Sequence, residues 1–195
     1  MQSSAWRTLG TDSILGYLRA DLKRASSSAW VLGPWIDAFF AQMLTSSLGS
    51  AVKLRVVTRP PSGASSSFVE HAIAARAYLA ERPNTSVKLL ANLHAKVVVI
   101  DEEIVYCGSA NWYRYSLEES REIVLRGPVA SAFALLDQIQ VIWDQAADAP
   151  LIGHPSEAKA AAEGGYTQEV IDPVAAAKLK EVPGSFVIGR SSRRR

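Results

Sequence analysis

The chain has 195 residues, of which 48% are hydrophobic and 21% are charged, and its formal net charge is +2. This composition is rich enough in apolar side chains to build a core, which excludes wholesale disorder. A single cysteine, Cys107, excludes a disulfide framework and a cysteine-based zinc site. No apolar run reaches the roughly 18–20 residues that span a bilayer, and the first ten residues lack the apolar stretch of a signal peptide. We therefore expect a cytoplasmic protein.

Charge is distributed unevenly along the chain. Residues 1–100 hold 11 basic and 5 acidic side chains, residues 101–189 hold 6 basic and 14 acidic ones, and residues 190–195 are basic. The basic first half can attract a polyanion such as nucleic acid. Folding can equally mix these charges so that no patch remains, and the charge pattern alone leaves both interpretations open.

Hydrophobic spacing and turn residues predict helices that alternate with strands. Apolar residues at helical spacing after Asp12, and again after Asp37, predict two helices that these aspartates cap. Runs of β-branched residues predict strands, and Pro, Gly and Ser mark the loops between them. In chain order the predicted elements are a helix over 12–24, a strand over 28–36 interrupted at Gly33-Pro34, a helix over 38–48, a strand over 52–58, a loop over 59–66, a helix over 68–81, strands over 86–90, 95–100, 104–107 and 122–125, and a helix from Pro128 to about Ala146.

This alternation, with one hairpin at 95–107, predicts an α/β fold: a mixed β-sheet flanked by helices on both faces. We assign residues 1–150 to this domain. Residues 151–195 are rich in Ala, Glu and Lys and are interrupted by Gly and Pro. They predict a less regular C-terminal extension with one helical piece over 173–181. Its basic end can grip nucleic acid or serve as a disordered, solubilising tail.

Six residues at fixed spacing carry the chemical information of this sequence. They are His94, Lys96 and Asp101, spaced H-x-K-x4-D, and Gly108, Ser109 and Asn111, spaced G-S-x-N. At average residue frequencies, such a set has a chance of about 10⁻⁸ per start position. It resembles the signature, or HKD motif, of the phospholipase D superfamily, and the order of elements over residues 12–146 fits the same resemblance. The resemblance implies a phospholipase D-like fold.

The alternation of side chains along a strand separates the motif residues. His94 and Lys96 are two residues apart and point to one face, whereas Asp101 falls on the other face, at the turn. We therefore expect Asp101 to hold the turn by hydrogen bonds to backbone amides rather than to touch substrate. Glu122 begins the next strand, where its carboxylate can accept the ring N–H of His94 and fix the histidine tautomer.

The resemblance implies phosphodiester hydrolysis without a metal. In the family, one motif histidine attacks phosphorus and a second protonates the leaving oxygen. Here His94 takes one of these roles, Lys96 and Asn111 stabilise the charge on the phosphoryl oxygens, and Ser109 is a further donor. Gly108 lets the backbone approach a ligand closely. The sequence contains no metal-ligand or nucleotide-binding pattern, so we expect neither a metal nor a cofactor.

The chain supplies one motif histidine where this mechanism needs two, because Lys does not follow two residues after His71 or His154. We expect a homodimer that completes the site across a two-fold axis. Our hypothesis is an endonuclease that cleaves DNA or RNA, because the chain is short, its first half is basic and membrane-binding segments are absent. The alternatives are a phospholipase or phosphatidyl transferase, and a catalytically silent nucleic-acid-binding subunit. The tail is compatible with a larger assembly that contains a helicase or translocase.

Two further residues are candidates for substrate binding. Arg59 begins the loop over 59–66, which can border the site and place this arginine near a phosphate, or can be a plain connector. Trp112 follows the motif directly and can stack on a base, as aromatic residues do in proteins that bind single strands. It can equally cover the core beside the site.

Overall fold

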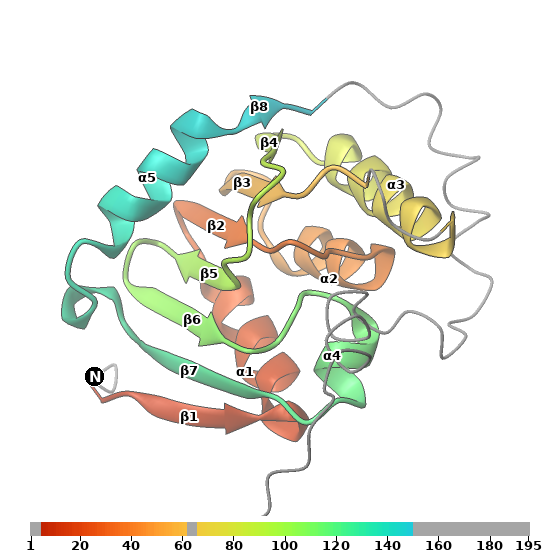
Figure 1. Cartoon of the computed structure of the whole chain (residues 1–195). Coiled ribbons are helices and arrows are strands. Elements are labelled where there is room, and N and C mark those ends of the chain that lie inside the picture. The colour runs from red at the N-terminus through yellow and green to blue at the C-terminus, as the bar shows by residue number, and fades with distance from the viewer. Residues whose placement is uncertain (1–4, 62–65, 150–195) are drawn as a thin grey trace, which may run out of the picture. The chain divides into compact units, whose positions relative to one another are not determined.

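The computed structural model describes residues 5–61 and 66–149, and within these ranges the predicted mixed sheet with helices on both faces is confirmed (Figure 1). The strands are β1 (Arg7–Gly10), β2 (Ser28–Leu32), β3 (Lys53–Thr58), β4 (Thr85–Leu89), β5 (Val97–Ile100), β6 (Ile104–Gly108), β7 (Ile123–Pro128) and β8 (Ala147–Asp148). The helices are α1 (Thr11–Arg24), α2 (Ala38–Ser47), α3 (Ser66–Glu81), α4 (Arg114–Glu118) and α5 (Leu135–Gln145). The extension expected over 151–195, with its helical piece, lies outside the described residues.

The strand order is β1-β7-β6-β5-β2-β3-β4-β8, with β2, β3 and β4 parallel and all other neighbours antiparallel. Parallel neighbours end at the same edge of a sheet, so the carboxyl ends of β2, β3 and β4 lie together. Leu32, the last residue of β2, pairs with Val97, the first residue of β5. The residues that enter β5 therefore lie at this same edge.

Side chains of the central strand β2 alternate between two cores. Ala29 and Val31 belong to the larger core, which the sheet forms with α1, α2 and α3, whereas Trp30 and Leu32 belong to the core under α5. Because both faces of β2 are buried, its sequence is apolar throughout rather than alternating. On the α5 side, the rings of Trp30 and Trp143 meet edge to face with centroids 5.5 Å apart.

The structure differs from the predicted elements at three points. The helix predicted to open at Pro128 begins at Leu135, because Pro128 still pairs with Ile104 in the sheet and a short 3₁₀ turn follows. Asp12 lies in the first turn of α1 and does not cap it, since the cap position is Gly10. The short elements β1, α4 and β8 were not predicted. Within the described ranges, no helix has the length and apolarity needed to span a bilayer.

A buried ionic cluster ties α1 to the middle of the sheet. Asp21 of α1 is 2% exposed, and its carboxylate accepts hydrogen bonds from the Tyr106 hydroxyl and, at 2.6 Å, from Arg126 Nε. Burial alone would raise the pKa of Asp21, but the hydrogen bonds from Arg126, Tyr106 and Arg24 hold it below its ordinary value. Burial and the neighbouring Asp21 carboxylate both raise the pKa of Tyr106. The cluster is therefore one anion held by two donors from adjacent strands.

Replacement of Arg126 by Met should lower the free energy of unfolding by about 3 kcal/mol, because it removes the more buried of the two arginines that pair with the Asp21 carboxylate. Urea denaturation at neutral pH measures the difference. Arg121→Met is the matched control, since Arg121 is exposed, and it should change stability by less than about 0.5 kcal/mol. An equal loss in the two variants would contradict this role of Arg126.

Candidate active site

The two halves of the sequence motif meet at one end of the β5–β6 hairpin. Val97 at the start of β5 pairs with Cys107 near the end of β6. His94 and Lys96 precede β5, and Ser109 and Asn111 follow β6, so all four lie at this end. The structure thus brings together the motif residues that the sequence predicts to act on substrate.

The side chains of His94 and Lys96 approach each other, as their two-residue spacing predicts. Lys96 Nζ lies 3.5 Å from His94 Nε2 and donates a hydrogen bond of 3.2 Å to the His94 carbonyl oxygen. Both residues lie in the segment directly before β5, outside the hydrogen-bonded sheet, and His94 is exposed. An imidazole and an ammonium group therefore stand side by side at an open edge of the sheet.

Glu122 does not accept a hydrogen bond from His94, contrary to the prediction. Its carboxylate accepts from the hydroxyls of Ser109 and Ser116, the latter at 2.6 Å from Oε1. The reason is strand order: Glu122 enters β7, which pairs with β6, so it lies beside the residues after β6 and one strand away from those before β5. Glu122 orders the G-S-x-N segment instead.

Asn111 lies in a closed environment with an unused amide oxygen. Its side chain is 6% exposed, and in the described part of the chain Oδ1 has no hydrogen-bond partner. The Asn111 backbone N–H donates to Ser116 Oγ at 2.9 Å, and this hydrogen bond holds the Asn111 backbone in place. Rotation about the last side-chain bond exchanges Oδ1 with the Nδ2 donors, so this amide can serve a ligand oxygen. A buried amide oxygen without a hydrogen-bond partner lowers the stability of the fold, and a ligand that supplies the missing hydrogen bond removes this penalty.

Asp101 lies at the opposite end of β5 from His94 and binds backbone amides, as expected. Its carboxylate accepts from the N–H groups of Ser26, Ser27 and Ser28 at 2.8 to 3.0 Å. These residues lead into β2, so Asp101 joins the hairpin turn to its neighbour strand rather than holding the turn alone. Burial opposes ionisation, but these hydrogen bonds outweigh it and lower the pKa of Asp101 to about 2.

Gly108 is required for the packing of strands, and the approach of a ligand to its backbone stays a prediction. A Cβ atom at this position would lie 2.2 Å from the Ile123 carbonyl oxygen and 2.7 Å from the Val124 Cα. Both atoms belong to the backbone of β7, which has no room to move away. The glycine therefore lets β6 and β7 close together under Ser109.

Trp112 is a core residue and cannot stack on a base. It is completely buried, its indole N–H donates to the Leu32 carbonyl oxygen at 2.7 Å, and its ring stacks on Phe40. Its contact with Gly33 is equally close, because a Cβ there would lie 2.2 Å from the indole ring. Trp112 fixes the segment after Asn111 against the end of β2.

Arg59 follows β3 at the same edge of the sheet. Its guanidinium carbon lies 5.1 Å from the centroid of the Trp35 ring. The sequence pattern placed Arg59 in a loop that can border the site, and β3 does end at the edge that His94 occupies. A phosphate contact at Arg59 stays a prediction.

Sequence reasoning missed three residues that order the site. Ser116 links the Asn111 backbone to Glu122, as described above. Thr11 Oγ1 donates to the Ser120 carbonyl oxygen and accepts from the Glu122 N–H at 3.0 Å, which holds the chain that enters β7. Asp37 caps α2 through Phe40 N and also accepts from Arg114 N at 2.7 Å. Only the Asp37 cap had a local sequence signal; the Ser116 contacts span five and six residues without a recognisable pattern, and the contacts of Thr11 and of Asp37 with Arg114 join segments far apart in the chain.

The sequence of residues 18–145 matches the family model described as "Cardiolipin synthase, PLD-like domain". This is more than half of the chain, so the protein belongs to this family of phospholipase D-like domains and to the phospholipase D superfamily. No curated protein sequence matches the chain.

Solved structures confirm the fold. NucT from Helicobacter pylori is 20% identical, with a TM-score of 0.61 over 74% of this chain and 100% of that one. The phospholipase D family member Nuc from Salmonella typhimurium is 17% identical, with a TM-score of 0.64 over 75% of this chain and 99% of that one. TrmBL2, an archaeal chromatin protein with a described mode of DNA binding, is 10% identical, with a TM-score of 0.53 over 76% of this chain and 55% of that one.

The residues described offer no group of three His, Cys, Asp or Glu side chains that could hold a metal ion. The polar groups that converge at the edge are an imidazole, an ammonium, an amide and two hydroxyls with their carboxylate. Such a set can supply a nucleophile or proton donor, a cation and neutral donors to an anionic group.

Replacement of Asp101 by Asn should lower the free energy of unfolding by about 1–2 kcal/mol at neutral pH, because an amide replaces a charged acceptor facing three N–H donors. The folded-state pKa of about 2 lies below the value of about 3.9 for an unfolded chain. Ionised Asp101 therefore stabilises the fold above about pH 4, and this contribution disappears as the pH falls toward 2.

Urea denaturation between pH 7 and pH 2.5 tests this, with Glu102→Gln in the same turn as the control. The free energies of unfolding of Asp101→Asn and of the parent should become equal as the pH is lowered. A difference that stays constant with pH would show that the charge of Asp101 is not the cause.

Proposed function

We propose that the protein is a phosphodiesterase that cleaves DNA or RNA through a phosphohistidine intermediate, at a site that two copies of the chain share. The observation that carries the proposal is the pair of His94 Nε2 and Lys96 Nζ, 3.5 Å apart on an exposed edge, at the same end of the β5–β6 hairpin as Asn111, whose buried Oδ1 has no hydrogen-bond partner among the described residues. Membership of the phospholipase D superfamily supports this chemistry, and the fold shared with Nuc and NucT supports a nuclease.

In the proposed reaction, a ring nitrogen of His94 attacks the phosphorus of a phosphodiester. An N–P bond forms, the bond from phosphorus to the leaving oxygen breaks, and His94 of the partner subunit gives its proton to that oxygen. The partner's His94 then takes a proton from water, whose oxygen attacks phosphorus and releases His94. Lys96 and Asn111 stabilise the phosphoryl oxygens as negative charge develops on them.

Ser109 and Glu122 act as positioning residues in this scheme. The carboxylate of Glu122 holds the hydroxyls of Ser109 and Ser116, and Ser116 in turn holds the Asn111 backbone. This chain of contacts fixes the place of the Asn111 amide relative to the hairpin, as pre-organised stabilisation of a transition state requires. Asp101 supports the site from the far end of the hairpin.

The purified protein should cut plasmid, single-stranded DNA or RNA in excess EDTA, and His94→Ala should lower the rate at least about 10³-fold because it removes the nucleophile. Gel analysis of cleavage measures both. His154→Ala, which changes a histidine outside the motif, is the matched control and should keep the parent rate. Cleavage that EDTA abolishes, or that survives in His94→Ala, would contradict the mechanism.

A shared site makes cleavage depend on two copies at once. When parent and His94→Ala protein are mixed in equal amounts and allowed to exchange subunits, activity per total protein should fall to about a quarter, because only one dimer in four has two His94 side chains. Independent sites would leave half of the activity. Light scattering on the same samples establishes the oligomeric state.

The name of the matching family favours a second candidate, phosphatidyl transfer on a lipid substrate. The same histidine chemistry would apply, with an alcohol in place of water. Vesicles of phosphatidylglycerol, incubated with the protein and analysed for new phospholipid, distinguish this activity from nucleic acid cleavage.

A further inference from the structure

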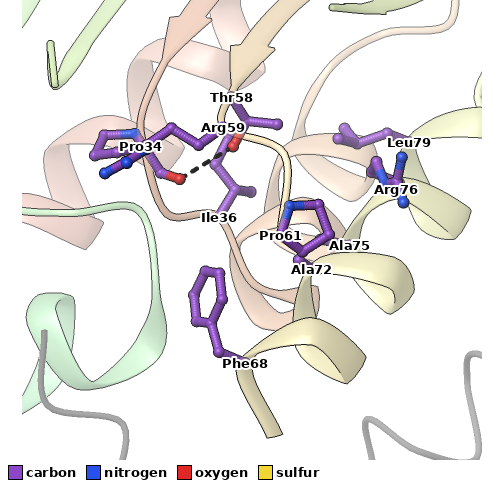
Figure 2. Close-up of a pocket in the computed structure, with 10 residues that line it drawn as sticks. All are labelled: Pro34, Ile36, Thr58, Arg59, Pro61, Phe68, Ala72, Ala75, Arg76 and Leu79. Carbon is purple, nitrogen blue, oxygen red and sulfur yellow. Dashed lines mark hydrogen bonds between the residues drawn. The ribbon is translucent and has the colours of Figure 1, made fainter. Parts of the chain in front are cut away.

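A pocket lies beside the candidate active site, at the same edge of the sheet (Figure 2). It is formed by the segment after β2, the end of β3 and one face of α3, with largely apolar walls that include Pro34, Ile36 and Phe68. The last residue of β3, Thr58, pairs with Leu89 of β4, and the chain then runs through residues 90–93 into His94. The pocket therefore adjoins the segment that carries the candidate nucleophile.

Arg76 of α3 lines this pocket and has no ion-pair partner among the described residues. Its Nε atom is buried and has no hydrogen-bond partner, and in residues 5–61 and 66–149 its guanidinium forms no ion pair. None of the described residues that line the pocket is acidic. Burial lowers the pKa of Arg76, which means that the protein holds the charged form at a free-energy cost. An unpaired, partly desolvated guanidinium is a mark of an anion-binding site.

Arg59 lines the same pocket, and within the described part of the chain its guanidinium contacts an aromatic ring and donates no hydrogen bond. Its guanidinium carbon lies 5.1 Å from the centroid of the Trp35 ring, and Phe68 packs edge-on against that ring at a centroid distance of 4.3 Å. A cation–π contact of this kind uses the positive charge of arginine and none of its N–H groups, which can still bind a phosphate. Figure 2 shows Arg59 and Arg76 on opposite sides of the pocket, so they suit two separate anionic groups rather than one.

We propose that the substrate strand crosses the mouth of this pocket next to the bond that is cut, with Arg59 and Arg76 each contacting one flanking phosphate. The inference rests on the proposed function and deepens it, because it assigns a polynucleotide with several phosphates as the substrate. A strand whose scissile phosphate lies at His94 crosses the carboxyl ends of β2 and β3 to reach the pocket. Bound phosphate supplies the counter-charge that Arg76 lacks in residues 5–61 and 66–149.

The test measures binding of a fluorescently labelled single-stranded DNA by anisotropy, in EDTA and at several salt concentrations, with all variants in the His94→Ala background so that the probe stays intact. Arg76→Gln and Arg59→Gln should each weaken binding about tenfold at low salt. Each should also reduce the slope of log K against log salt by about 0.7, which corresponds to one phosphate contact on a single strand.

Arg55→Gln is the matched control. Arg55 lies on β3, the strand that Arg59 follows. Its guanidinium carbon also lies over a tryptophan ring, 4.4 Å from the centroid of Trp30, but Arg55 does not line the pocket. This variant should bind with the parent affinity and slope. Arg76→Lys keeps the charge and loses the planar fork, so its affinity should be intermediate and its slope unchanged.

Stability separates a binding role from a structural one. Because Arg76 forms no ion pair within the described part of the fold, Arg76→Gln should unfold at a temperature equal to or above that of the parent while it binds more weakly. Equal affinity and slope in Arg76→Gln and the parent would overturn the inference, and so would failure of the parent to bind nucleic acid. The proposed function fails separately, if the chain binds in an Arg76-dependent manner but the unmodified protein cuts no nucleic acid.

Discussion

The pairing of β5 with β6 is the interaction on which the rest of the site depends. The pair Val97–Cys107 aligns the residues before one strand with those after the other, so His94 and Asn111 lie at the same end of the hairpin although its two strands separate them in the chain. Asp101 secures the far end of the same hairpin to the start of β2. Gly108 lets β7 approach closely, which brings Glu122 to the G-S-x-N segment. The motif residues therefore all belong to the β5–β6 hairpin or to the segments that join it, including those that do not lie at the edge of the sheet with His94.

The architecture was predictable because its main elements carry strong local signals. The apolar run of β2, the Asp37 cap of α2 and the β-branched strand β5 each predict their own structure. The elements that escaped prediction are short and draw their stability from distant partners: β1 has four residues, of which only Leu9 is buried, and it exists through its pairing with β7. Pro128 misled because proline is as compatible with the end of a strand as with the start of a helix.

The members of the site were predictable from the sequence, but their contacts were not. The spacing of His94 and Lys96 fixes their common side, and the structure agrees. The hydrogen-bond partners of Glu122 depend on which strand lies next to β7, and no local sequence pattern predicts the order of strands. Trp112 looked available to a ligand in a linear reading, whereas its place against Gly33 and Phe40 is a property of the packed core. Arg76 carried no signal at all, because its significance is the absence of an acidic neighbour in the described fold.

The contact of Thr11 with Ser120 and Glu122 has a consequence for the order of folding. Those partners are 109 and 111 residues away in the chain, so closing this contact carries a large loop entropy and comes after the local hairpins have formed. β1 joins β7 through equally distant pairs, such as Leu9 with Val124. The segment that holds Glu122 therefore gains these contacts only when β1 and the start of α1 have met β7, so the local β5–β6 hairpin can form before the site is complete.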